Sequence, residues 1–150
     1  MSEGSEKPTR VLVLNGPNLS RLGTREPDIY GTLNYPQLVE FCESVGADMN
    51  LAVEVRQSDS ESELIGWIHE AVDSATPVVL NPAAFTHYSY ALRDACAQHS
   101  ALLIEVHLSN PAAREQFRQT SVISAVSDGT IAGFGPRSYA LALTAVASMV

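Results

Sequence analysis

Two side chains suited to proton transfer stand close together near the middle of the chain. Glu105 and His107 are two residues apart in the apolar run ALLIEVHL (101–108), which reads as a buried strand. Successive side chains of a strand alternate between its faces, so this spacing places both on the same face. A histidine beside a carboxylate is suited to donate or accept a proton near neutral pH. The pair therefore indicates a general acid or base.

A second group of candidate catalytic residues lies in the long polar stretch NGPNLSRLGTREPDIYG (15–31), directly after the apolar run VLVL. Loops of this length after a strand tend to be active-site lids or binding loops. Arg25 and Tyr30 lie on it, between Gly23 and Gly31. A tyrosine has an ordinary pKa of about 10, and a neighbouring guanidinium lowers that pKa by favouring phenolate. We expect a catalytic lid that carries a base, the alternative being that Tyr30 packs on the core and Arg25 is solvated.

Alternating strands and helices must position these groups. Strands are predicted at 10–14, 51–57, 77–81, 101–108 and 130–135, and helices at 35–49, 60–73, 87–98, 110–117 and 138–149. This order predicts a parallel sheet covered by helices on both faces. Five strands in this length favour a flavodoxin-like doubly wound sheet, a three-layer α/β/α fold, over a closed barrel. Residues 1–8 are expected to form a disordered tail and 9–150 a single domain.

The predicted topology brings several polar residues together. In an open α/β sheet, ligands bind beyond the carboxyl ends of the strands where strand order reverses, here between the first and third strands. Polar residues near the ends of the first, third and fourth strands are Asn15, Asn18, Asn81, Thr86, His87, Glu105, His107 and Ser109. Together they predict a pocket. The alternatives are that Asn15 and Asn18 are turn residues, that Asn81 merely ends its strand, and that His87 caps a helix.

Composition narrows the possible partners. The formal net charge of −8 argues against general nucleic-acid or membrane-surface binding, but local arginines would still allow an anionic substrate. Cys42 and Cys96 fit neither a metal spacing nor a disulfide framework and are expected in the core. The acidic run SDSESE (58–63) is better explained by Ser60 and Glu63 as a helix capping box than by a metal site. A polar N-terminus and the lack of a long apolar run predict a cytoplasmic protein.

Four segments, in order and spacing, resemble the type II 3-dehydroquinate dehydratases. They are LNGPNLSRLGTREPDIYG (14–31), QSDSE (57–61), LNPAAFTHYSYALRDA (80–95) and IEVHLSNPAAREQFR (104–118). The resemblance covers essentially the whole chain after the tail. It implies a flavodoxin-like enzyme without metal or cofactor that forms trimers associating into dodecamers. The implied reaction is the anti elimination of water from 3-dehydroquinate through an enolate, giving 3-dehydroshikimate in the shikimate pathway.

The resemblance also assigns the proton-transfer roles. Tyr30 is similar to the base that removes the C2 proton, and Arg25 to the partner that holds it as phenolate. His107 resembles the general acid for the departing C1 hydroxyl, with Glu105 setting its protonation. Asn18 would position the water that stabilises the enolate oxygen.

Substrate contacts follow from the same resemblance. Asn81, Ser109 and the backbone at Leu108 would bind the substrate carboxylate and a nearby hydroxyl. His87 and Arg118 would hold the ring hydroxyls. Asp94 would reach in from a neighbouring subunit of the trimer.

The sequence departs from the family pattern at a few positions. Many relatives have glycines where Ala83 and Ala84 stand, and a small hydroxyl residue at Tyr88; the segment 136–138, Pro-Arg-Ser, also differs. These departures concern substrate positioning and subunit packing, and they leave the proton-transfer residues intact.

Other chemistries fit the sequence less well. The sole lysine, Lys7, stands in the tail, so composition excludes the Schiff-base mechanism of the unrelated type I enzymes. A flavin or nucleotide-binding module would need small hydroxyl residues and glycines where Pro17 and Leu19 stand. A non-catalytic relative that binds a partner through the lid would not need the intact acid and base.

Overall fold

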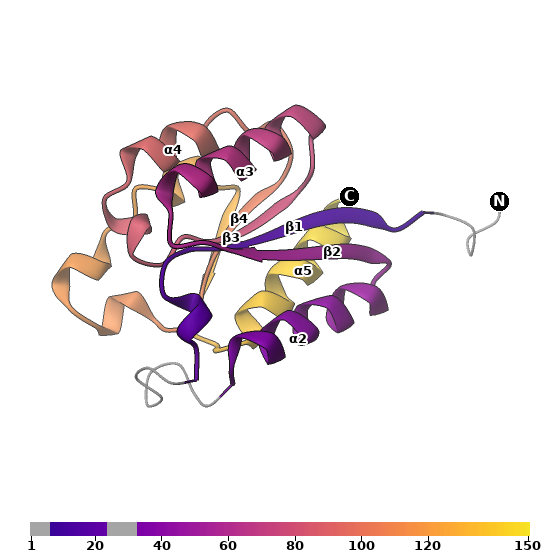
Figure 1. The fold of residues 1–150 in the computed structure, drawn as a ribbon, viewed down its shortest axis with the longest axis horizontal. Helices are drawn as coiled ribbons and strands as arrows, with labels where there is room; N and C mark the ends of the chain where they lie inside the picture. Colours follow the sequence, from indigo (N-terminus) through magenta and orange to yellow (C-terminus); the bar gives the residue numbers. More distant parts are fainter. Residues whose placement is uncertain (1–6, 24–32) are drawn as a thin grey trace.

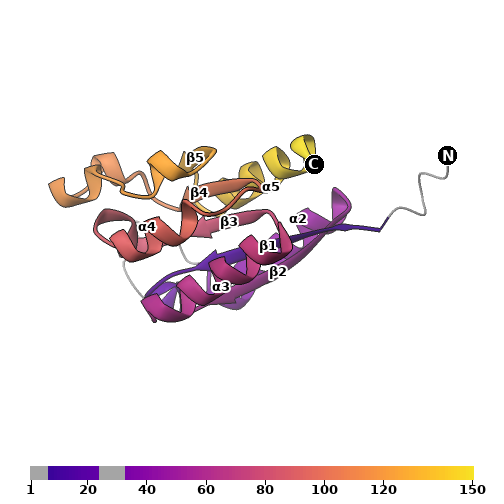
Figure 2. The same ribbon diagram turned by 90° about the horizontal axis from the view of Figure 1, so that it is seen from above.

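Five apolar runs form a single parallel sheet in the computed structural model of the chain, which describes residues 7–23 and 33–150 (Figure 1). The strands are β1 (Thr9–Asn15), β2 (Leu51–Gln57), β3 (Val78–Asn81), β4 (Leu103–His107) and β5 (Gly129–Ala132). Their order across the sheet is β2-β1-β3-β4-β5, as Figure 2 shows from above. The predicted flavodoxin-like topology, with its reversal between β1 and β3, is therefore confirmed.

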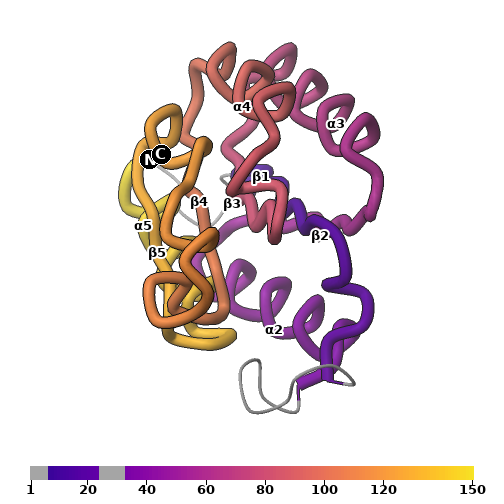
Figure 3. Tube along the Cα trace, turned by 90° about the vertical axis from the view of Figure 1, so that its left-hand side faces the viewer, coloured from indigo at the N-terminus to yellow at the C-terminus, as the bar shows by residue number. Residues whose placement is uncertain are grey.

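Two helices cover each face of the sheet. The helices α2 (Tyr35–Asp48) and α5 (Arg137–Met149) lie on one face, and α3 (Glu61–Ser74) and α4 (Tyr90–Cys96) on the other (Figure 3). In β1, Val11 and Val13 pack in the core under α2 and α5, whereas Leu12 and Leu14 pack under α3 and α4. A central parallel strand is apolar on both faces because helices cover both.

Side-chain caps set where the helices begin. The Oγ of Ser60 accepts from the backbone N–H of Glu63 at 3.2 Å at the start of α3, as predicted. The Ser60 N–H instead donates to the Ser58 hydroxyl at 2.9 Å, so Ser58 supplies the second half of the expected capping box. A reciprocal box, not predicted, joins Asn34 and Gln37 at the start of α2.

The predicted helix at 110–117 is wrong. Two short 3-10 turns, Pro111–Ala113 and Gln116–Gln119, occupy this region. The first begins where the Asn110 side chain accepts from the Ala112 N–H, and it ends at Arg114, whose backbone is extended. The local hydrogen bond of an asparagine followed by proline favours a turn over a continuing helix.

Two other elements are shorter than predicted. The segment expected as helix 87–98 is α-helical only from Tyr90 to Cys96, as α4, which follows the Ser89 cap. His87 instead ends a preceding 3-10 turn, Ala83–His87. The last strand ends before Gly133 and Gly135, whose positive φ angles of 98° and 61° turn the chain toward α5.

The two cysteines lie in the core, as expected. Cys42 of α2 and Cys96 of α4 are buried and free, and burial raises the pKa of each thiol to about 12. Across residues 7–23 and 33–150, no helix combines the length and the apolar character required to cross a membrane.

A candidate active site at the carboxyl edge of the sheet

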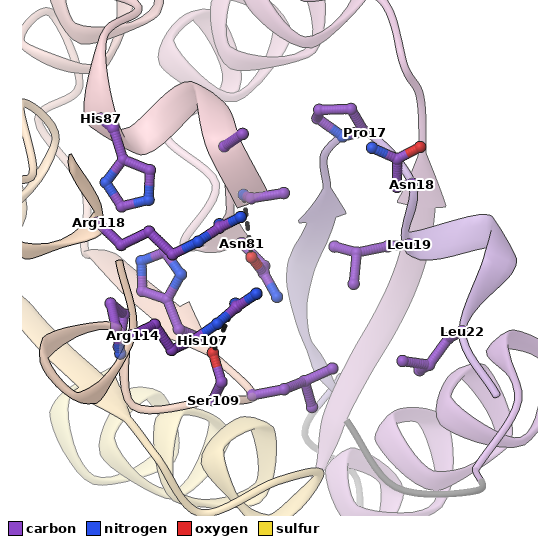
Figure 4. Close-up of a pocket in the computed structure, with 14 residues that line it drawn as sticks. Pro17, Asn18, Leu19, Leu22, Asn81, His87, His107, Ser109, Arg114 and Arg118 are labelled. Carbon is purple, nitrogen blue, oxygen red and sulfur yellow. Dashed lines mark hydrogen bonds between the residues drawn. The ribbon is translucent and has the colours of Figure 1, made fainter. Parts of the chain in front are cut away.

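A pocket opens beyond the carboxyl ends of β1, β3 and β4 (Figure 4). Together with its open mouth it encloses about 680 Å³. The predicted site residues that line it are Asn18, Asn81, His87, His107, Leu108, Ser109 and Arg118. Leu19 and Leu22, from the segment after β1, face the polar residues across the pocket. The helices after β1 and β3 leave the sheet on opposite faces, and this divergence produces the crevice.

His107 and Glu105 form a tight buried pair at the end of β4. The His107 Nε2 lies 2.6 Å from the Glu105 Oε2, as their spacing in the strand predicted. Glu105 is 1% exposed and His107 8% exposed. His107 lines the pocket, and Glu105 lies behind it.

The environment of Glu105 fixes which nitrogen of His107 carries a proton. Three hydroxyl groups donate to the Glu105 carboxylate: Thr86 at 2.5 Å, Ser124 at 2.6 Å and Ser121 at 3.0 Å. A carboxylate surrounded by donors acts only as an acceptor, so the His107 Nε2 must donate to it. The Nδ1 atom is consequently the ring nitrogen that can exchange a proton with a ligand.

The same contacts keep Glu105 ionised. Burial raises the pKa of Glu105, but hydrogen bonds from His107, Ser124 and Thr86 outweigh this effect and leave its pKa below the ordinary value. A buried carboxylate with this many donors is stable as an anion. Glu105 can therefore orient the His107 ring by accepting its Nε2–H.

Two arginines make the wall of the pocket that carries His107 cationic (Figure 4). Arg114 and Arg118 line the pocket, and no carboxylate belongs to the lining that the described residues provide. Arg114 donates to the Ser109 hydroxyl at 3.3 Å. Arg118 donates to Glu115 at 2.9 Å, and its guanidinium stacks 4.6 Å from the centre of the Phe117 ring. This local positive charge in a chain of net charge −8 favours an anionic ligand.

His87 presents a hydrogen-bond acceptor to the same pocket. Its Nδ1 lies 2.7 Å from the carbonyl oxygen of Thr120. A carbonyl only accepts, so Nδ1 carries the hydrogen and Nε2 is the acceptor of the neutral ring. Burial, and to a lesser degree the charge of Arg118, lowers the pKa of His87, which favours that neutral form.

Asn18 occupies a strained turn at the pocket mouth. Its φ is 71°, in the left-handed region that asparagine tolerates better than most residues. The backbone N–H of Asn18 donates to Asp59 at 2.9 Å, and Gln57 also donates to Asp59, at 3.1 Å. The alternative that Asn18 is a turn residue is thus correct for its backbone, while its side chain remains exposed beside the pocket.

Asn81 lies at the pocket floor, at the end of β3. Its Oδ1 accepts from the backbone N–H of Ala83 at 3.1 Å, and its Nδ2 donates to the Tyr139 hydroxyl at 2.9 Å. Asn81 therefore both ends its strand and contributes to the pocket, so the two interpretations of this residue are compatible.

Comparison with known proteins agrees with this geometry. A sequence profile described as "Dehydroquinase class II" matches residues 9–147. The chain belongs to the class II dehydroquinase family. A 3-dehydroquinate dehydratase of Salinispora tropica is 60% identical over 134 residues, covering 89% of this chain and 94% of that protein.

Solved structures of the family share the fold. The crystal structure of a type II dehydroquinase from Propionibacterium acnes has a TM-score of 0.93 and 54% identity, covering 96% of this chain and 99% of the other. A type II dehydroquinase from Butyrivibrio crossotus has a TM-score of 0.91 and 44% identity, covering 94% of this chain and 99% of the other. The predicted family and the predicted enzyme class, a hydro-lyase of the 3-dehydroquinate dehydratase type, are confirmed.

Among the predicted site residues that the structure describes, Asp94 stands apart from the pocket of its own chain. Tyr30 and Arg25 lie outside the described residues, so their roles stay predictions. Asp94, on α4, is exposed, pairs with Arg93 at 2.9 Å and does not line the pocket of its own chain.

The residues that depart from the family pattern differ in backbone conformation, exposure and hydrogen bonding. Ala83 has a φ of 53°, a conformation that glycine adopts without strain and alanine does not. Tyr88 is 58% exposed and packs edge-on against Phe85. Ser138 is buried at the start of α5 and accepts from the Phe134 N–H at 3.1 Å, so its hydroxyl has a structural role.

Sequence reasoning missed several residues that build the site. Ser121 and Ser124 hold Glu105 from an irregular segment that lacks a periodic pattern. Arg114 was not predicted as a site residue. Its position four residues before Arg118 was the available signal that the two arginines could act together. Tyr139 lies on α5, and nothing in its helix pattern distinguishes it from an ordinary core residue.

Proposed function

We propose that the protein dehydrates 3-dehydroquinate to 3-dehydroshikimate by an anti elimination through an enolate, the shikimate-pathway reaction that its family implies. The observation that carries this proposal is the buried Glu105–His107 pair facing a cationic pocket. A β-hydroxy ketone needs a base for the proton next to the carbonyl and an acid for the departing hydroxyl. The site supplies a suitable acid.

His107 acts as the acid. Its Nε2–H donates to Glu105, and a proton on Nδ1 is transferred to the hydroxyl at C1 of the substrate. The C–O bond breaks, the hydroxyl leaves as water, and the enolate electron pair forms the new double bond. The ionised Glu105 accepts the Nε2–H, which leaves Nδ1 as the nitrogen that gives up the proton.

Tyr30 acts as the base. As phenolate it removes the proton at C2, and the C–H electron pair moves into the enolate. Arg25 holds the phenolate by its positive charge. Asn18 orients the water that donates to the enolate oxygen, in keeping with its side chain beside the pocket.

The remaining polar residues bind the substrate. Asn81, Ser109 and the backbone at Leu108 bind the carboxylate, near which Arg114 adds positive charge. His87 and Arg118 bind ring hydroxyls, His87 as acceptor through Nε2 and Arg118 as donor. The active assembly is a trimer or a dodecamer built from trimers, in which Asp94 completes a neighbouring pocket.

An ultraviolet assay tests the proposal. Purified protein mixed with 3-dehydroquinate is expected to form the absorbing conjugated enone, without added metal and after treatment with a chelator. Borohydride added with substrate should leave the enzyme active, because no imine forms. Absence of enone formation, or inactivation by a trapped imine, would overturn the proposal.

Two substitutions test the assignment of roles. Tyr30→Phe and His107→Asn should each lower kcat at least about 10²-fold, the lower range for general acid–base catalysis. KM should change much less in Tyr30→Phe, because the phenolate serves mainly the transition state. His69→Asn is the matched control: this exposed α3 histidine lies away from the pocket, and its variant should behave as wild type.

A further inference from the structure

Three buried polar side chains lie against one another at the pocket floor and directly behind it. Asn15 at the end of β1 and Asn81 at the end of β3 are register partners in neighbouring strands. Tyr139 of α5 contacts both of them through its hydroxyl. The exposed fractions of Asn15, Asn81 and Tyr139 are 0%, 3% and 0%. Asn81 lines the pocket, and the other two lie behind it.

The hydrogen bonds among these groups have a single direction. The Tyr139 O–H donates to the Asn15 Oδ1 at 2.5 Å. A phenol has one hydrogen, so the same oxygen must accept from the Asn81 Nδ2, at 2.9 Å. Burial raises the pKa of Tyr139 well above its ordinary value, and the hydroxyl therefore keeps its hydrogen.

This direction determines which end of the Asn81 amide faces which partner. The Oδ1 is held by the Ala83 N–H at 3.1 Å, and one Nδ2 hydrogen is held by Tyr139. The second Nδ2 hydrogen is the group that Asn81 can offer to a ligand. A flipped amide would offer its oxygen instead, and an oxygen repels an anionic ligand.

We propose that Tyr139 is a positioning residue that fixes the Asn81 amide with its N–H available to the substrate carboxylate. This inference rests on the proposed function, in which Asn81 binds that carboxylate. Tyr139 touches no substrate. It acts from α5 by removing the freedom of the Asn81 amide to turn over.

Steady-state kinetics of the assembled enzyme with 3-dehydroquinate tests this role. Tyr139→Phe keeps the ring in the core and removes only the hydroxyl. KM is expected to rise about tenfold, the size of one hydrogen bond to a charged group, while kcat changes less than about threefold. In an Asn81→Ala background the same change should raise KM less than about twofold, because there is no amide left to position.

Two further variants keep the test decisive. Asn15→Ala frees the Tyr139 hydrogen to turn toward Asn81, so KM should rise although Asn15 does not line the pocket. This variant serves if Tyr139→Phe does not fold. Tyr35→Phe is the matched control: its ring packs against the same core cluster as Tyr139, no hydrogen bond among the described residues joins it to Asn81, and KM should stay within about twofold of wild type.

The outcomes separate the two proposals. An inactive wild-type protein overturns the proposed function and this inference with it. An active wild-type protein whose KM is unchanged by both Tyr139→Phe and Asn15→Ala overturns this inference alone. The inference also fails if the effects of Tyr139→Phe and Asn81→Ala on KM simply multiply, because independent effects would show that Tyr139 does not act through Asn81.

Discussion

Glu105 lies in a hydrogen-bond environment that requires a carboxylate. Each of its hydrogen-bond partners in the described part of the chain donates a hydrogen: the hydroxyls of Thr86, Ser121 and Ser124, and the Nε2–H of His107. Glutamine has the same shape but offers one acceptor oxygen and a donor NH₂. The glutamine NH₂ would then point at a neighbouring group that is itself a donor, or His107 would have to change its tautomer.

We therefore expect Glu105→Gln to lower kcat about 10²-fold, within the range for loss of general acid catalysis. The unfolding free energy should also fall by about 1–3 kcal/mol, because a buried donor is left without an acceptor. Kinetics and denaturant unfolding measure the two effects. Ser124→Ala is the matched comparison, since it removes one donor and leaves the carboxylate. A Glu105→Gln enzyme with kcat within about threefold of wild type would contradict the role given to Glu105.

His99 predicts a pH dependence of stability that is separate from catalysis. Burial lowers the pKa of His99 below the ordinary value of 6.5, against the weaker raising effects of the nearby Thr76 and Leu102 backbone and of Asp128. Both ring nitrogens of His99 are buried without a hydrogen-bond partner of good geometry among the described residues. The unfolded chain therefore binds a proton at higher pH than the folded chain does. The stabilisation from neutral His99 is full above pH 6.5 and is lost as the pH falls through the lower folded pKa.

The expected result is a Tm that falls as the pH is lowered from 7.5 to about 5.5, and falls less steeply in His99→Gln. Thermal unfolding at a series of pH values measures both slopes. His69→Gln, which alters an exposed histidine of α3, should keep the wild-type slope. Equal slopes in wild type and His99→Gln would show that His99 does not contribute to the acid sensitivity.

At the scale of the elements, two alanines occupy positions suited to glycine. Ala75 ends α3 with φ 51°, and Ala83 follows β3 with φ 53°. The left-handed conformation costs an alanine about 1–2 kcal/mol, more than glycine loses through its larger freedom in the unfolded chain. Ala75→Gly and Ala83→Gly should each raise Tm by about 2–4 °C in thermal unfolding. Ala84→Gly is the control, since Ala84 is not among the residues with positive φ, and it should leave Tm unchanged or lower it.

The strands and helices differ in how well the sequence predicts them. Buried strands and long amphipathic helices repeat with clear periods, so the sheet, its order and the Glu105–His107 pair were all predicted correctly. The segment after β4 has no such period. Its turns are set by single residues such as Asn110 and Pro111, and a helix was predicted there wrongly. Ser121 and Ser124 belong to this segment, and for that reason the donors around Glu105 could not be found.

For the whole molecule, the position of Asp94 bears on assembly. This exposed residue of α4 does not line its own pocket, so a direct catalytic role requires a second copy of the chain. The hydrophobic pattern of one chain cannot reveal that a residue completes the site of a neighbouring subunit. Only the resemblance to the type II 3-dehydroquinate dehydratases suggested this role for Asp94. Asp94→Asn should lower activity at least about 10²-fold if the carboxylate completes a neighbouring site.

Mixing experiments distinguish a shared site from a local effect. Asp94→Asn and Tyr30→Phe subunits, each inactive alone, should regain partial activity after joint dissociation and reassembly. In the mixed assemblies, some sites combine an intact Tyr30 from one subunit with an intact Asp94 from its neighbour. Asp73→Asn, at an exposed position of α3, controls for the loss of a surface charge and should remain active. A fully active monomer in sedimentation would contradict the shared site.

The bond between Tyr139 and Asn15 joins residues 124 positions apart. During synthesis on the ribosome, at about 5–20 residues per second, β1 therefore waits roughly 6–25 s before the side chain that anchors its carboxyl end has been made. Asn81, which is made later, likewise lacks this partner until Tyr139 has been made. The pocket floor can acquire its final arrangement only after α5 emerges, so binding competence appears at the end of translation rather than growing with the sheet.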